Sequence, residues 1–204
     1  MKTIKWRTAA ITCLLCLLPI LLGLSLWERL PDTMAIHFNI HNEPDNFAPK
    51  GVVVFALPVL MAVTQCFSCV MIDLNSARNG ESKKMERVSK WIGPVMSIVL
   101  QVVTLGYGLG WDIDIRRAAG LIVGAMFLVL GNYLPKLDYV KNYKLPTEKA
   151  RKINRFMGFE TVIMGVLLLA SLLLPPVATV ICLCLLIPYT LLSVGYAIKV
   201  VREK

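Results

Sequence analysis

Long uncharged apolar runs constrain the fold of this chain more than any other feature of its sequence. A helix that crosses a bilayer needs about 20 consecutive apolar residues, and four uncharged runs are each long enough to cross or nearly so. These runs lie at residues 8–27, 51–72, 91–111 and 118–135.

A fifth uncharged run, from Thr161 to Ile198, is too long for a single helix. Pro175 and Pro176 interrupt it, and proline breaks a helix because it lacks a backbone donor and clashes with the preceding turn. We therefore expect two spans joined by a tight turn. The first must reach back into the preceding basic segment to be long enough, which gives predicted spans at 156–174 and 177–198.

The composition agrees with a membrane protein. Of the 204 residues, 56% are hydrophobic and only 17% are charged, whereas soluble domains average about 25% charged residues. Six spans leave little of the chain for anything else. The sequence therefore predicts an all-α membrane protein with one integral membrane domain over residues 1–204, and it excludes a soluble enzyme domain that carries an anchor.

The distribution of lysine and arginine predicts which side of the membrane each loop faces. With the N-terminus in the cytoplasm, 18 of the 22 basic residues fall in cytoplasmic segments, and an excess of basic residues marks that side. Trp6 and Trp91 then fall at the inner boundary and Trp27 and Trp111 at the outer one, as an interfacial aromatic belt requires. We expect both termini in the cytoplasm. The net charge of +9 then reflects topology, and no basic face suited to nucleic acid is visible.

The segment between the first two spans, residues 28–50, is too elaborate for a simple connector. It carries both histidines of the chain, three prolines and two more acidic than basic residues. Proline and asparagine divide it into turns, and the alternation from residue 33 to residue 40 predicts a short strand with Met34, Ile36 and Phe38 on one side. We expect a small ordered extracellular cap, because a surplus loop without a role is usually mobile.

Few residues suggest catalysis or metal binding. His37, His41, Glu43 and Asp45 are one conceivable metal cluster, but two histidines without a third strong ligand favour a recognition surface. No nucleophile with a matching base is evident. We therefore predict neither an enzyme nor a cofactor.

Two C-x-x-C pairs, Cys13 with Cys16 and Cys66 with Cys69, would indicate zinc in a soluble protein. Four thiolates in hydrocarbon surroundings would be electrostatically costly, while free cysteine packs well as a small apolar residue. We interpret these cysteines as packing residues.

Glu160 and the loop 136–155, both near the predicted cytoplasmic side, each have more than one interpretation. Glu160 is the only acid that we place within a span, and an intramembrane acid is a functional candidate, although pairing with Arg155 at the inner boundary would give it a structural role. The inner loop 136–155 is strongly basic, and its second half predicts a short helix with Thr147 as N-cap. Its charge fits anionic lipid headgroups or, alternatively, a cytoplasmic partner.

The cap and the inner loop carry recognisable motifs. The stretch LPDTMAIHFNIHNEPDNFAPK resembles the DUF1648 domain, which heads the SdpI family of bacterial membrane proteins, from its Leu-Pro start to its final lysine. Further on, GNYLPK resembles the family's glycine-asparagine start of an inner loop, and KINRFMG resembles its entry to the fifth helix. Two features differ from the family pattern. The glycine that the family has near Asn42 is missing, and KNYKLPTE stands where the family usually has an inner stretch that contains a Pro-Trp pair.

The resemblance implies a multi-pass immunity and signal-transduction protein of the bacterial cell membrane. Such a protein gives tolerance to an extracellular membrane-active peptide toxin and, in the founding case, binds a cytoplasmic transcriptional repressor. The altered inner stretch weakens the expectation of repressor binding here. A small-solute or ion transporter and a metal-dependent membrane enzyme stay open as alternatives.

The motifs divide the candidate site residues into three groups. Carboxylates and rings that an arriving peptide would meet are Asp32, Phe38, Asp45 and Phe47. The structural motif of the cap comprises Pro31, His37, Asn39, Pro44 and Lys50, and the inner-loop motif comprises Gly131, Asn132, Pro135, Lys136, Arg155 and Gly158.

Overall fold

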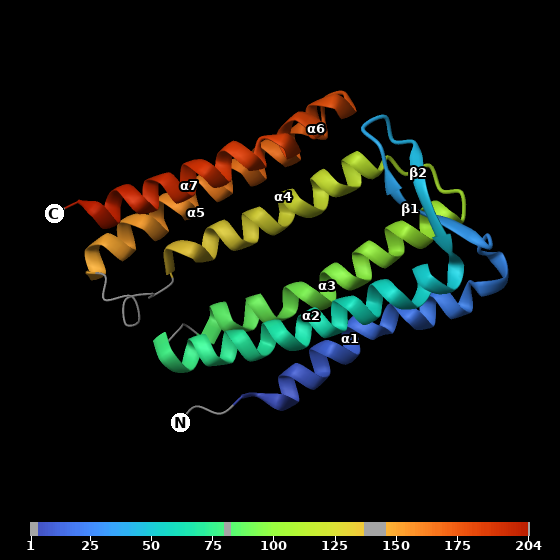
Figure 1. Ribbon diagram of the computed structural model, residues 1–204, viewed down its shortest axis with the longest axis horizontal. Helices are drawn as coiled ribbons and strands as arrows, with labels where there is room; N and C mark the ends of the chain where they lie inside the picture. The colour runs from blue at the N-terminus through green and yellow to red at the C-terminus, as the bar shows by residue number, and fades with distance from the viewer. Residues whose placement is uncertain (1–3, 80–82, 137–145, 204) are drawn as a thin grey trace. The chain divides into compact units, whose positions relative to one another are not determined.

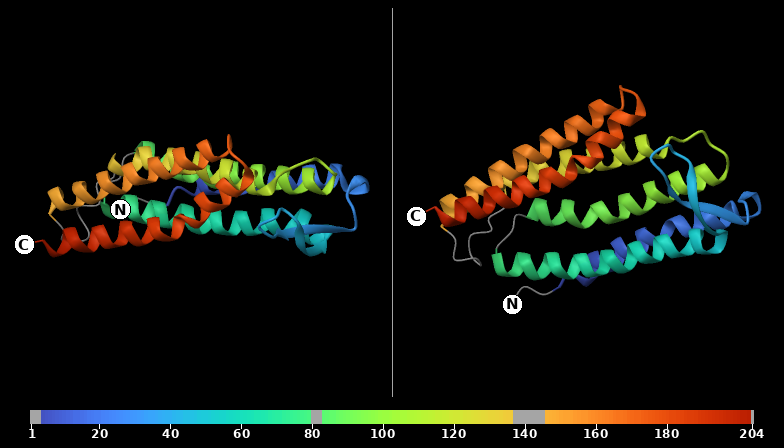
Figure 2. Two further views of the ribbon diagram at one scale, coloured as in Figure 1. Left: turned by 90° about the horizontal axis from the view of Figure 1, so that it is seen from above. Right: turned by 45° about the horizontal axis from the view of Figure 1, so that its top comes forward.

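The computed structural model describes residues 4–79, 83–136 and 146–203. These residues form helices and one two-stranded sheet (Figures 1 and 2). The chain divides into two compact units. The first comprises Met1–Leu74 and Glu86–Ile115, and the second comprises Asn75–Met85 and Arg116–Lys204.

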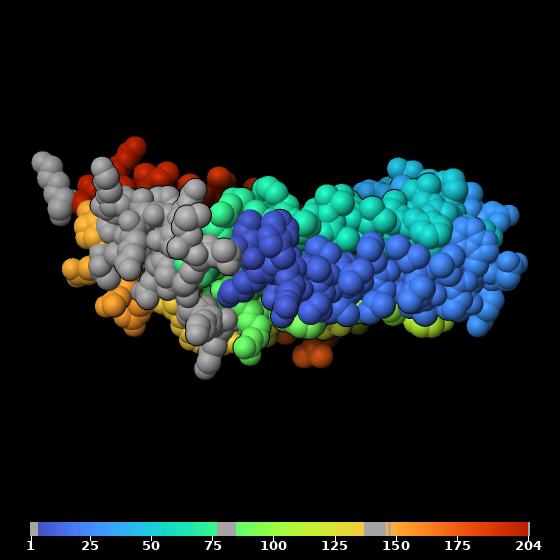
Figure 3. Space-filling model, turned by 90° about the horizontal axis from the view of Figure 1, so that it is seen from below, coloured from blue at the N-terminus to red at the C-terminus, as the bar shows by residue number. Residues whose placement is uncertain are grey.

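The first unit is built from three long helices and a hairpin. The helices lie side by side, the hairpin connects the first helix to the second, and a short 3-10 helix, η1, follows the first helix (Figure 1). In the space-filling view, α1 (dark blue) lies along α2 (teal) (Figure 3). The bounds are α1 (Trp6–Ser25), η1 (Trp27–Arg29), β1 (Thr33–Phe38), β2 (Pro44–Pro49), α2 (Lys50–Asn79) and α3 (Lys83–Gly108).

Polar side chains of α3 bind the backbones of both neighbouring helices. The Ser97 hydroxyl donates to the Cys16 carbonyl of α1 at 2.8 Å, and the Gln101 amide donates to the Val53 carbonyl of α2 at 3.2 Å. Both side chains are fully buried. Because apolar surroundings offer a polar group no water, such bonds between helices pair the Ser97 hydroxyl and the Gln101 amide N–H and fix the packing.

An apolar core joins the hairpin to α2 and α3. Met34 of β1 and Ala48 of β2 are buried there, and they pack in one cluster with Leu30, Val53, Val54 and Leu105. An isolated two-stranded hairpin is marginally stable in water. The cap therefore takes its order from this core.

A buried network of charged side chains lies where α1 and α3 begin and α2 ends, and Figure 1 shows these helix ends opposite the hairpin. The Lys90 ammonium of α3 pairs with Asp73 of α2 at 2.6 Å and with Glu86, one turn earlier on α3, at 3.2 Å. Lys5 donates its backbone N–H to Asp73 at 2.9 Å, and its ammonium pairs with Glu86. Two lysines balance two carboxylates, so the network links all three helices without net charge.

The second unit contains the remaining helices. α5 packs against η2, α6 and α7. Pro176 is the first residue of α6, as the Pro175-Pro176 pair predicts, because a proline fits the first helical turn but not the interior. The bounds are α4 (Ile115–Tyr133), η2 (Leu134–Lys136), α5 (Thr147–Ser171), α6 (Pro176–Cys184) and α7 (Leu186–Arg202).

The basic segment before the fifth span is the start of α5 and not a separate short helix. Pro146 occupies the N-cap position and Thr147 is already helical, so the prediction of Thr147 as N-cap is wrong by one residue. The helix begins nine residues before the predicted span at 156–174 because basic residues with good helix propensity continue it. Residues 137–145 of the predicted inner loop lie outside the described residues.

Arg117, near the start of α4, binds the C-terminal end of α5. Its guanidinium donates to the Leu172 carbonyl at 3.2 Å and to the Leu174 carbonyl at 3.1 Å. The last carbonyls of a helix have no partner within the helix, and a basic side chain there both bonds them and complements the helix dipole. This contact ties α4 to the turn that leads into α6.

Within the described residues, six helical segments are long and apolar enough to cross a membrane, so the chain is a multi-pass membrane protein. The last of these segments combines α6 and α7. The candidate spans are Trp6–Ser25, Lys50–Ser76, Met85–Gly108, Ile115–Lys136, Glu148–Ser171 and Pro176–Arg202.

Asp73 and Glu86 lie inside two of these candidate spans. These two helices, α2 and α3, continue beyond the predicted uncharged runs, and the charges that this brings into the helices pair with one another. That Glu160 is the only acid inside the membrane stays a prediction.

The Lys90 network predicts a large loss of stability on breaking it. In Lys90→Ala, Asp73 and Glu86 keep buried charges without their main partner, and removing one member of a buried ion pair costs about 3–5 kcal/mol. We expect a clearly lower unfolding temperature of the purified protein in detergent. Arg87→Ala, which removes the same charge from an exposed position on the same helix, is the control and should change little. Equal unfolding temperatures for Lys90→Ala and the parent would contradict this account.

Candidate functional site: the cap hairpin

The two strands of the cap pair antiparallel with two irregularities. Thr33 lies opposite Pro49 and Ala35 opposite Phe47, but the register shifts on either side of His37. Ile36 is left without a pairing partner, which is the arrangement of a β-bulge.

The bulge changes which side chains face the core. Met34 and Ala35 are both buried, whereas Ile36 and His37 are both exposed. The predicted alternation, with Met34, Ile36 and Phe38 on one side, is therefore wrong at Ile36. One extra residue in a strand shifts the side chains that follow it to the other face.

Asn39 closes the turn between the strands. Its side-chain carbonyl accepts the backbone N–H groups of His41 at 2.9 Å and of Glu43 at 3.0 Å. Its amide donates to the Glu43 carboxylate at 2.9 Å. Asparagine is a frequent turn residue because its side chain bonds the backbone two residues on.

Asn42 ties this turn to the segment that follows α3. Its side-chain carbonyl accepts the Ile115 N–H at 2.8 Å, and its amide donates to the Ile113 carbonyl at 3.4 Å. Its φ of 67° is in the left-handed region, which asparagine adopts more readily than most residues. Asn42 thus adopts this backbone conformation and also adds two hydrogen bonds to the segment after α3.

Lys50 fixes the opposite end of the hairpin. Its backbone N–H donates to the Asp32 carbonyl at 2.8 Å, and its ammonium pairs with the Asp32 carboxylate at 3.1 Å. The same ammonium lies 5.2 Å from the centre of the Trp27 ring, within range of a cation–π interaction. The hairpin is thus held at its turn, at its base and, through Met34, along its inner face.

The proposed recognition residues differ in how they are held. Phe38 packs edge-on against Tyr107 of α3, with ring centres 4.7 Å apart, and Asp45 lies 2.5 Å from the His37 ring nitrogen Nδ1. Phe47 is 55% exposed and the Asp32 side chain is 95% exposed. The hairpin therefore presents Phe47 and Asp32 outward, whereas Phe38 also contributes to docking.

The two glycines of the inner-loop motif lie in the second unit, where α4 packs closely against α5. A Cβ on Gly131 would lie 2.8 Å from the Val162 nitrogen and 2.9 Å from the Gly158 carbonyl oxygen. A Cβ on Gly158 would lie 2.5 Å from Pro135 and 2.9 Å from the Gly131 carbonyl oxygen. Small residues that let two helix backbones approach are a common means of packing in membranes. Gly131, Pro135 and Gly158 thus form one contact.

The other residues of that motif lie apart from this contact. Lys136 donates to Asn132 at 3.4 Å and lies 4.9 Å from the centre of the Tyr133 ring. Arg155 is exposed on α5.

Glu160 lies between α5 and α7, where its carboxylate accepts a hydrogen bond from Ser193. The structural interpretation of the sequence expected Arg155 as the partner of Glu160, but the partner is Ser193. The second carboxylate oxygen of Glu160 has no hydrogen-bond partner among the described residues. Beside it, the Thr161 hydroxyl donates to the Met157 carbonyl at 2.6 Å, so it accepts the bond from the Tyr189 hydroxyl at 2.7 Å.

In the part of the chain that the structure describes, no group of three or more histidine, cysteine, aspartate or glutamate side chains is arranged to hold a metal ion. This holds for the histidines and acids of the cap and for the two C-x-x-C pairs. All six cysteines are free thiols.

Several residues of the site were not singled out by the sequence. Tyr107 and Asn42 position the cap, and Asp73, Glu86 and Lys90 form the buried network. The left-handed preference of asparagine was one available signal for Asn42, and the i, i+4 spacing of Glu86 and Lys90 was another for the network.

Comparison with known proteins matches one domain family to this chain. The family described as "Domain of unknown function (DUF1648)" matches residues 14–62, which run from α1 through the hairpin into α2. No curated protein and no solved structure matches the chain.

The glycine contact in the second unit predicts a sharp difference between positions. Gly131→Ala and Gly158→Ala each place a methyl group against backbone atoms of the facing helix, so we expect each variant to unfold at a lower temperature. Gly195→Ala is the matched control, because a Cβ there meets nothing within 4 Å and alanine favours a helix by about 0.5–1 kcal/mol over glycine. Equal behaviour of the three variants would show that the close approach is not needed.

Proposed function

We propose that this chain is an SdpI-like immunity protein of the bacterial cell membrane, whose cap recognises an extracellular membrane-active peptide. The observation that carries the proposal is the DUF1648 match, because it centres on a hairpin that is anchored to the helices on one side and exposed on the other. The SdpI resemblance of the inner stretches GNYLPK and KINRFMG supports the same assignment.

The exposed surface of the hairpin has the chemistry that a cationic amphipathic peptide needs. Ile36, Ile40 and Phe47 are large apolar side chains with at least half of their surface exposed. Asp32 and Glu43, which lie near these apolar residues in the sequence, add two carboxylates. Carboxylates steer a cationic partner toward the surface, and an exposed aromatic side chain supplies contact energy when it is covered.

The proposed orientation puts the cap outside and both termini in the cytoplasm. It is supported by the 18 basic residues that this orientation assigns to cytoplasmic segments. The four-residue charge network and the cap lie at opposite ends of the first unit, which suits a unit that crosses the membrane. Signalling to a cytoplasmic repressor would use an inner surface, and the basic first turns of α5 are one described part of it.

Transport of a small solute or ion is the second candidate function. It is favoured by the ionisable groups buried in candidate spans, namely Lys90, Asp73, Glu86 and Glu160, because intramembrane charges commonly mark ion pathways. Vesicles containing the purified protein should then conduct protons or cations, and Glu160→Gln should abolish that flux. Absence of flux would remove this candidate, and a flux that is unchanged in Glu160→Gln would exclude Glu160 from the ion pathway.

The immunity proposal predicts that Phe47 and Asp32 of the cap are needed for tolerance. Asp32→Asn also removes the ion pair with Lys50, but it keeps the backbone bond between the two residues, so the cap should still fold. In susceptible bacteria that produce the protein, the parent should raise the inhibitory concentration of at least one member of a panel of membrane-active peptides. Phe47→Ser and Asp32→Asn should each lower that concentration by about fivefold or more, since losing one important contact costs more than about 1 kcal/mol.

The control for this experiment is His41→Ala, an exposed change in the same turn, which should keep tolerance. Immunoblots of the membrane fraction must show equal amounts of all variants. The proposal fails if Phe47→Ser and Asp32→Asn accumulate normally and protect as well as the parent does.

A further inference from the structure

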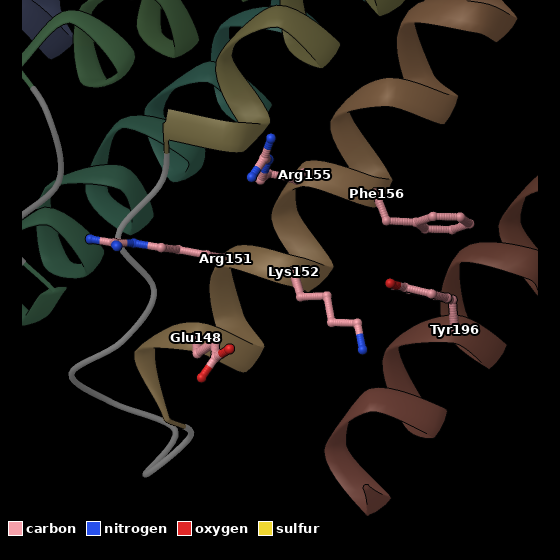
Figure 4. Close-up of a pocket in the computed structure, with 6 residues that line it drawn as sticks. All are labelled: Glu148, Arg151, Lys152, Arg155, Phe156 and Tyr196. Atoms are coloured by element: carbon pink, nitrogen blue, oxygen red, sulfur yellow. The ribbon is translucent and has the colours of Figure 1, made fainter.

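The first turns of α5 and the last turns of α7 enclose an open pocket of about 710 Å³ in the second unit (Figure 4). Its lining combines three cations, one acid and two aromatic rings. These residues are Glu148, Arg151, Lys152, Arg155, Phe156 and Tyr196. Neither the cap nor the proposed recognition of a peptide uses them.

The wall of the pocket between the two helices is held by direct contacts. Phe156 and Tyr196 stack with ring centres 3.8 Å apart and an angle of 20° between the rings, and Figure 4 shows Lys152 beside them. The Lys152 ammonium pairs with Glu203, just after α7, at 3.0 Å, and Lys149 donates to the carbonyls of Val201 and Glu203. These contacts use part of the positive charge to fix α7 against α5.

The two arginines are placed differently. Arg151 and Arg155 are four residues apart, so they lie on one face of α5, and Figure 4 shows both on the side away from Phe156. Neither forms an ion pair with another residue in the described ranges. A guanidinium binds a phosphate through two parallel hydrogen bonds, and this makes a pair of arginines a good phosphate site.

The face that carries the arginines continues as an apolar stripe. Phe159 and Ile163 follow Arg155 at intervals of four residues, Val166 lies one turn further, and all three are exposed. They fall inside the candidate span Glu148–Ser171, whose first turn lines the pocket. The charged part of the pocket thus lies at the membrane surface, and the stripe runs from it into the hydrocarbon.

We propose that this pocket is a binding site for an anionic phospholipid. Arg151 and Arg155 hold the phosphate, the pocket between α5 and α7 takes the rest of the headgroup, and one acyl chain lies along Phe159 and Ile163. A free phosphate would use the arginines but not the apolar stripe. An acidic peptide in water would not reach a stripe that lies in hydrocarbon. The combination therefore selects a lipid.

The test is native mass spectrometry of the full chain, purified in neutral detergent and mixed with dioleoylphosphatidylglycerol or dioleoylphosphatidylcholine. The parent should bind the anionic lipid in preference to the zwitterionic one. The double variant Arg151→Gln with Arg155→Gln should bind the anionic lipid about thirtyfold more weakly, because each basic residue near an anionic headgroup contributes about a fivefold factor.

The matched control is Arg7→Gln with Arg87→Gln, which removes two exposed charges from α1 and α3 of the first unit and should leave lipid binding unchanged. The proposal is overturned if both double variants lose the lipid equally, or if the parent binds the two lipids equally. Displacement of the lipid by inorganic phosphate would identify a site for a free anion instead. Displacement by a polyglutamate peptide would identify a docking surface for an acidic protein segment instead.

Discussion

The burial of Met34 between the hairpin and the helices is the interaction on which the cap depends. A two-stranded hairpin has too little apolar surface to be stable alone, and Met34 with Ala48 supplies the face that packs on α2 and α3. Asn42 and Lys50 add polar anchors at the two ends. A surface held in this way binds with a smaller entropic cost than a mobile loop would, which is the physical basis for assigning recognition to the cap.

The sequence predicted the helices well where the signal is local. The uncharged runs and the Pro175-Pro176 break located the candidate spans, because length and hydropathy are properties of one segment. The ends of the helices were predicted less well. Asp73 and Glu86 were placed in a loop, since a charge next to an apolar run normally marks its end. The spacing of Glu86 and Lys90 is local, but the pairs of Lys90 with Asp73 and of Lys5 with Glu86 join different helices, and such pairing is not visible in a local pattern.

The cap shows the same division between local and long-range information. Its turns were predicted from proline and asparagine, and β1 from an alternating pattern. The bulge at Ile36 was not predicted, because register is set by the partner strand and by docking of the turn. The contacts of Asn42 with Ile113 and Ile115, and of Phe38 with Tyr107, also join segments distant in the chain. They separate the residues that only hold the cap from Phe47, which faces outward, and from Asp32, which faces outward and also pairs with Lys50.

The glycines of the inner-loop motif have a packing role that requires no partner, so the functional claim rests on the cap and on its side of the membrane. The most direct measurement uses a variant whose six cysteines are replaced by alanine or serine, with a single cysteine at His41 or at Arg87. A membrane-impermeant maleimide should label His41→Cys in intact cells and Arg87→Cys only after the cells are permeabilised. Labelling of Arg87→Cys but not of His41→Cys in intact cells would place the cap in the cytoplasm and contradict recognition of an extracellular peptide.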